Sequence, residues 1–302
     1  MPRLRPRKRP KRTRSNNMAT VTMDMIKALR EITHAGIMDC KKALQESDGD
    51  FDKAEEYLKK VGLAAVEKRV DRATDNGRVT YVVTETKAVM IEVTCETDFV
   101  AKNEQFKELG AQLCVMAIEN GYTEPNDAMQ AVVNELIATI NENMKVKRLV
   151  AVDIAKNEFV MGYNHADGNI GVLVKFAAKN ADAFKSEAFK TFAFNTAMHV
   201  CAASPMYLCD ADVPKDYEEK QLEIFRAQVA SDEKLKNKPE KVLEGIVTGK
   251  LKKHYAEICL MDQVFQISND DGLTVAQLLA KFNKDNGTDV KIVGYERFLA
   301  GA

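Results

Sequence analysis

The sequence EVTCETDFVA at residues 92–101 decides how this chain is interpreted, because it joins a strand to a turn and a helix start. Apolar residues dominate positions 88–93, and a polar turn follows them. Just past this turn, Asp98 and Phe99 stand side by side. By residue chemistry alone, Thr97 caps a helix, Asp98 is favourable in its first turn and Phe99 packs into the core. The opposite interpretation is that the acid and the aromatic ring probe a partner surface.

Strands and helices alternate in two blocks around this junction. The first block holds a predicted hairpin, with strands at 78–84 and 88–94, and two helices follow it. Because residues 88–117 can be laid roughly over residues 171–201, we predict a duplicated core of the α+β class with antiparallel sheets. The other expected elements are a helix at about 125–143, strands at 148–154, 159–163 and 170–176, a helix at about 183–203, a helix at 274–282 and a strand at 290–298.

Helical patterns lie before and within this core. Three short helices with tight turns predict a compact bundle, comparable to the small ubiquitin-associated domains. Later in the chain, two charged helical stretches with few apolar residues predict an antiparallel hairpin that projects from the body. The predicted division is a disordered basic extension at 1–17, the helical bundle at 19–65, a linker at 66–77, one core subdomain at 78–146, a second core subdomain at 147–213 and 258–302, and the hairpin at 214–257.

The charge is unevenly distributed along the chain. Residues 1–17 carry six arginines, two lysines and no acid, although the whole chain has a net charge of −1. Such an arm could bind nucleic-acid phosphates, but we favour an extension unrelated to the fold, because Met18 looks like a natural start of the folded part. No stretch approaches the ~18 apolar residues of a membrane helix. The six scattered cysteines form no Cys-x-x-Cys pair and indicate reduced thiols in a cytosol-like compartment.

Familiar catalytic and ligand-binding motifs are missing from the sequence. Residues 245–251 have one residue too few between glycines for a phosphate loop, and Leu251 replaces the required Ser or Thr. The four histidines are widely separated, and His199 is expected to be a satisfied or exposed helix histidine. No nucleophile, base and orienting group come together in the pattern. We therefore interpret the chain as a binding protein and not an enzyme, with no cofactor, no metal and no bound nucleotide.

Three separated motifs occur in a defined order: LREITHAGIMDCKKAL at 29–44, EVTCETDFVA at 92–101, and GVLV at 171–174 followed by AMHV at 197–200. This ordered set resembles the translation elongation factor Ts family over about residues 19–298. The resemblance implies a cytoplasmic guanine nucleotide exchange factor that promotes release of GDP from the GTPase elongation factor Tu, by disturbing its magnesium and phosphate sites. Such exchange makes and breaks no chemical bond, in agreement with the missing catalytic motifs.

The resemblance also implies which residues contact the partner. Asp98 and Phe99 match a pair that wedges between two helices of the GTPase near its magnesium site, and Val100 belongs to the same box. This reverses the interpretation of Phe99 from a core residue to an exposed wedge. His199 matches a histidine that presses on a helix of the GTPase and disturbs its phosphate loop.

The small helical domain contributes further expected contacts. Arg30 and Met38 match contact positions, and Ile37 stands where Met is common, a change that keeps apolar volume. His34 stands where Gly is common, which departs from the family pattern at a turn. Two alternatives of another class stay open: a free-standing module that binds ubiquitin-like partners, and a ribosome- or nucleic-acid-associated protein that uses residues 1–17.

Overall fold

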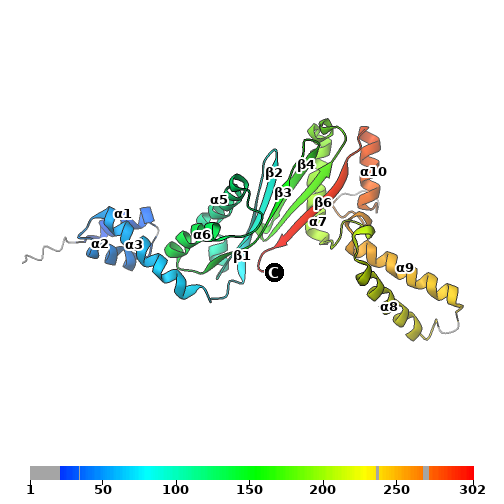
Figure 1. Cartoon of the computed structure of the whole chain (residues 1–302), viewed down its shortest axis with the longest axis horizontal. Coiled ribbons are helices and arrows are strands. Elements are labelled where there is room, and N and C mark those ends of the chain that lie inside the picture. The colour runs from blue at the N-terminus through cyan, green and yellow to red at the C-terminus, as the bar shows by residue number, and fades with distance from the viewer. Residues whose placement is uncertain (1–20, 34, 236–237, 268–271) are drawn as a thin grey trace, which may run out of the picture. The chain divides into compact units, whose positions relative to one another are not determined.

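The computed structural model in Figure 1 describes residues 21–33, 35–235, 238–267 and 272–302. The predicted disorder of residues 1–17 and the turn at His34 lie outside the described residues. The described elements form two compact units, one made by residues up to 71 together with 134–141, and the other by 72–133 and 142–302. Helices and antiparallel strands occur together in the chain, so the predicted α+β class is confirmed.

The first unit contains the predicted three-helix bundle, with α1 at Met23–Thr33, α2 at Ile37–Glu46 and α3 at Phe51–Val66. Asp50 caps α3 as its side chain accepts the Lys53 amide at 3.2 Å. The three helices are amphipathic, and their apolar faces pack together in one core, which supplies most of their stability. The core of the bundle consists of Ile26, Leu29, Ala35, Cys40, Ala43, Leu44 and Ala54.

The second unit is built on two three-stranded antiparallel sheets. In the first sheet, β2 (Lys87–Cys95) lies between β1 (Asn76–Val83) and β3 (Met144–Asp153). In the second sheet, β5 (Ile170–Ala177) lies between β4 (Glu158–His165) and β6 (Lys291–Leu299). Each central strand precedes a helix of 17 residues, α5 at Glu104–Asn120 and α7 at Glu187–Ala203, which are the elements expected to be duplicated.

The boundary expected at 146/147 falls inside β3. This strand pairs with β2 along its length, from Asp153 opposite Lys87 to Met144 opposite Cys95. Residues 147–153 therefore belong to the first sheet, because their backbone hydrogen bonds go to β2 and not to the strands that follow. Sequence spacing alone had grouped them with the second block.

The two sheets pack face to face, and a helix covers the outer face of each. Contacts between β1 and both β4 and β5 join the sheets, while α5 packs on β1 and β2, and α7 packs on β4 and β5. Glycines allow this close approach: a Cβ added at Gly162 would lie 2.2 Å from the Tyr81 ring, and one at Gly171 would lie 2.3 Å from Val79. The sandwich thus depends on two positions where no side chain fits.

The remaining helices are α6 at Asp127–Ile140, α8 at Lys215–Ser231, α9 at Glu240–Ile258 and α10 at Val275–Asn286. Helices α8 and α9 contact each other and form the predicted helical hairpin. Helix α6 ends before the predicted residue 143, because Asn141 adopts a left-handed conformation with φ of 68° and terminates the helix. Short 3₁₀ helices occur at Glu67–Arg69, Ala166–Gly168, Ala181–Lys185, Asp210–Asp212 and Leu260–Asp262.

Candidate partner-binding site

The junction after β2 contains a single turn of helix, α4, at Asp98–Ala101. Thr97 is extended, with φ of −124° and ψ of 156°, and its side chain accepts the Val100 amide at 3.4 Å. The next helix, α5, begins two residues after α4, where the Asn103 side chain accepts the Gln105 amide at 2.8 Å. The helix start and the capping role of Thr97 that residue chemistry predicts are therefore confirmed.

The Phe99 side chain does not pack into the core, since the residue is 81% exposed. Its neighbour Val100 is 7% exposed and anchors α4, which contacts β1 and β2. Of the three residues expected from the box, Asp98 and Phe99 face solvent and Val100 faces inward. The turn therefore leaves one large apolar ring in water directly beside a buried residue.

Asp98 adds an exposed carboxylate next to the ring. Its carboxylate lies 2.7 Å from the Lys102 ammonium, one turn later, and both side chains are exposed. The hydrogen bond from Lys102 lowers the pKa of the Asp98 carboxyl below its ordinary value. Asp98 is thus ionised at neutral pH, and solvent screens its pairing with Lys102.

His199 lies in α7 and is fully buried. Its Nδ1 accepts the Gln266 amide at 3.3 Å, so the proton is on Nε2, which donates to Gln263 Oε1 at 3.1 Å. The ring stacks on Phe265, with 5.1 Å between the ring centroids. Burial lowers the pKa of His199, which is therefore neutral at pH 7. This is the satisfied helix histidine of the first interpretation, and the structure does not bring it to the surface.

Gln263 was not predicted from the sequence. It is buried, and its amide also donates to the Glu257 carbonyl at 2.8 Å. Because it lies 64 residues from His199, no local pattern connects the two.

The expected contact residues of the first unit lie at the end of α1 and the start of α2. Arg30 and Ile37 are exposed, and Met38 is 72% exposed. Ile32, which sequence reasoning missed, is also exposed. The helical period gave no signal of this exposure, because Ile32 comes three residues after Leu29, a spacing that predicts a shared apolar face.

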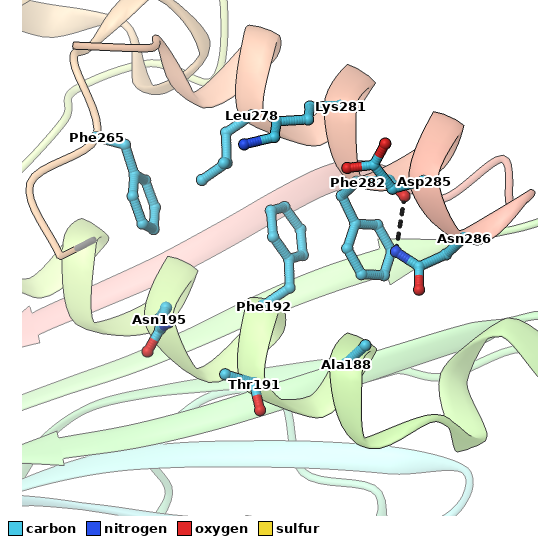
Figure 2. A pocket seen from close by; sticks show the side chains of 10 residues that line it. All are labelled: Ala188, Thr191, Phe192, Asn195, Phe265, Leu278, Lys281, Phe282, Asp285 and Asn286. Atoms are coloured by element: carbon cyan, nitrogen blue, oxygen red, sulfur yellow. Dashed lines mark hydrogen bonds between the residues drawn. The ribbon is translucent and has the colours of Figure 1, made fainter. Parts of the chain in front are cut away.

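A cavity of about 240 Å³ lies between α7 and α10, as Figure 2 shows. Its floor is aromatic, with the rings of Phe192 and Phe282 stacked at 4.8 Å between centroids. The Asn286 side chain at its rim donates to the Phe282 carbonyl at 2.9 Å, so this amide is hydrogen-bonded within α10. The lining includes no histidine or cysteine, and its volume is below that of most small-molecule sites.

Within the described part of the chain, no three His, Cys, Asp or Glu side chains come together as metal ligands. Among the described helices, none is both long and apolar enough to cross a membrane.

The chain is similar to known proteins over most of its length. A family model described as Elongation factor TS matches residues 96–302. The protein described as Elongation factor Ts from Treponema denticola is 39% identical over 267 residues, covering 88% of this chain and 93% of that relative. The relative of the same description from Borrelia garinii subsp. bavariensis is 39% identical over 285 residues, covering 94% and 100%. That from Trichlorobacter lovleyi is 38% identical over 295 residues, covering 93% of both. As the three ordered motifs predict, the chain belongs to the elongation factor Ts family, which acts in the elongation stage of translation.

Proposed function

We propose that this chain binds the GTPase elongation factor Tu in the cytoplasm and accelerates the release of its GDP. The observation that carries the proposal is the exposed Phe99 ring beside the ionised Asp98, on a turn anchored by Val100. Family membership supplies the identity of the partner. The activity is exchange by binding, so the chain is not an enzyme that changes covalent bonds and needs no cofactor.

The mechanism is a thermodynamic linkage between two ligands of the GTPase. If the chain binds the nucleotide-free GTPase more tightly than the GDP-bound form, it must weaken GDP binding by the same factor. The two binding events compete through the conformation of the GTPase, and GDP leaves faster. GTP then restores the nucleotide-bound form and displaces the chain.

Phe99 and Asp98 are assigned different parts in this mechanism. The exposed ring loses water when it enters an apolar gap between two helices of the GTPase, which favours the opened form by about 1.5–3 kcal/mol. Asp98 exchanges its solvent-screened pairing with Lys102 for polar groups that otherwise support the magnesium ion of the GTPase. Both residues extend from one turn of helix, so the ring and the charge arrive together.

His199 takes part only after a rearrangement. For its ring to press on the GTPase, the hydrogen bonds with Gln263 and Gln266 must break and Phe265 must move aside. We therefore assign His199 to a later step than Phe99. A separate docking surface for the same GTPase is proposed in the first unit, formed by Arg30, Ile37 and Met38. Val100 is buried next to Phe99 and holds the turn that carries this ring.

The test is the release of a fluorescent GDP analogue from elongation factor Tu, measured with and without this chain at micromolar concentration. Acceleration supports the proposal, and its absence would refute it. Phe99→Ala and Asp98→Ala are expected to slow release, and Phe194→Ala is the matched control, since this ring is also exposed but lies on α7.

A second candidate function rests on the eight positive charges of residues 1–17, which could bind RNA or ribosomes. Removing these residues separates the two functions. Loss of salt-sensitive RNA binding with unchanged GDP release would assign the arm a role of its own.

A further inference from the structure

Two glutamates interlock the turn before Phe99 with the segment that follows α6. The Glu142 carboxylate accepts two hydrogen bonds from Thr97, from the amide at 3.0 Å and from the hydroxyl at 2.8 Å. In the opposite direction, the Glu96 carboxylate accepts the Asn143 amide at 2.6 Å and a guanidinium hydrogen of Arg72 at 3.3 Å. Thr97 is thus bonded to Glu142, and its neighbour Glu96 is bonded to Asn143, the neighbour of Glu142.

The Glu142 bond also determines how Thr97 caps α4. The Thr97 hydroxyl has a single hydrogen, which it donates to Glu142. A lone pair of the same hydroxyl is then turned toward the Val100 amide, which it accepts at 3.4 Å. The chain of hydrogen bonds runs from Glu142 through Thr97 to the residue after Phe99.

Helix α4 needs this external support. It has only four residues, and a single turn of helix is unstable by itself. Its direction is therefore determined by the groups that hold its ends, which are the capped Thr97 before Phe99 and the buried Val100 after it. Neither family resemblance nor sequence pattern singled out Glu142, which lies 45 residues from Thr97.

We propose that Glu142 is a positioning residue for nucleotide exchange: it holds Thr97 and so keeps the Phe99 ring in the direction that enters the GTPase. This inference rests on the proposed function. Glu142 itself does not contact the GTPase in this account. Its loss leaves Phe99 present and exposed but distributes the ring over more directions, so a smaller fraction of encounters opens the nucleotide site.

The motion of the turn can be measured in the chain alone. The sequence has no tryptophan, so Phe99→Trp introduces a single fluorophore at the tip. In this background, Glu142→Gln and Glu142→Ala are expected to increase the nanosecond depolarisation of Trp fluorescence. The matched control is Glu158→Gln, because Glu158 also accepts a backbone amide, that of Ala155 at 2.8 Å, in the β3–β4 connection. An unchanged depolarisation in the Glu142 variants would overturn the inference.

Exchange is then measured as a double-mutant cycle at sub-saturating chain concentration, where the rate of GDP release depends on the productive fraction of encounters. Glu142→Gln is expected to slow GDP release about tenfold, equivalent to one charge-assisted hydrogen bond. In a Phe99→Ala background the same change is expected to have no further effect on the rate of GDP release. A residue that only stabilises the fold would instead slow GDP release by the same factor with and without Phe99, and would lower the unfolding midpoint in both backgrounds.

The outcomes separate the inference from the proposed function. Wild-type acceleration that Glu142→Gln leaves unchanged, or slows equally with and without Phe99, would overturn the inference alone. A wild-type chain that does not accelerate GDP release would overturn the proposed function itself.

Discussion

Truncation of Phe99 to alanine is expected to abolish most exchange while leaving the fold nearly as stable as before. A fully buried Phe costs about 3–5 kcal/mol when replaced by Ala. Phe99 is 81% exposed, so only about a fifth of the residue is covered. Scaled by that fraction, Phe99→Ala costs about 0.6–1 kcal/mol of unfolding free energy.

The control for this prediction lies seven residues further along the chain. Phe106, in the first turns of α5, is 1% exposed, so Phe106→Ala is expected to cost the full 3–5 kcal/mol or so. Urea unfolding followed by circular dichroism compares the two variants with the wild type. A loss of stability for Phe99→Ala as large as that for Phe106→Ala would show that the ring is packed, and would refute the reasoning.

The exchange assay supplies the second half of the prediction. If the exposed ring is buried in the opened GTPase, its removal costs about 2–3 kcal/mol of transition-state stabilisation. GDP release should then slow about 30- to 160-fold, since each 1.36 kcal/mol or so is a factor of ten. Release at the wild-type rate by a folded Phe99→Ala chain would contradict the assignment of Phe99 as the wedge.

Three further changes test other parts of the molecule. Gly162→Ala forces a Cβ to within 2.2 Å of the Tyr81 ring and should cost about 1–3 kcal/mol by urea unfolding, whereas Gly294→Ala meets open space and serves as control. Folding lowers the pKa of His199 from its ordinary value of 6.5. As the pH falls below 6.5, the unfolded chain therefore binds a proton at this residue before the folded chain does. Stability should therefore fall as pH drops from 7.5 to 5, and His199→Gln should flatten that dependence, as unfolding midpoints at the two pH values will show. Deleting residues 1–17 should leave GDP release unchanged, and a filter assay between 50 and 200 mM salt shows whether the full chain has any salt-sensitive RNA binding that this deletion removes.

Much of the local structure could be predicted from short sequence patterns. Alternating and helical periodicities located the strands and helices of both sheets and of the three-helix bundle, with ends shifted by a few residues. Thr97 was identifiable as a helix cap because capping is a contact within three residues. The helix ending at Ile140 was overextended because Asn141 in a left-handed conformation is a stop that the apolar pattern does not reveal.

Contacts between distant segments could not be predicted in this way. The pairing of β3 with β2 assigns residues 147–153 to the first sheet, although they follow the first block in sequence. The bonds of Glu142 to Thr97 and of Gln263 to His199 span 45 and 64 residues. Each depends on how folded elements approach one another, which no periodicity encodes.

Phe99 and Phe106 illustrate what the sequence determines and what the tertiary structure determines. Both are aromatic residues near a helix start, and residue chemistry favours the core for each. The sequence by itself determined the strand, the cap and the helix starts, because these arise from interactions between near neighbours along the chain. Residue chemistry could not separate the two rings, although the family resemblance predicted an exposed Phe99. Only the tertiary structure supplies the physical difference, in which Phe106 is covered and Phe99 is left in water, since burial depends on which distant segments pack against a side chain.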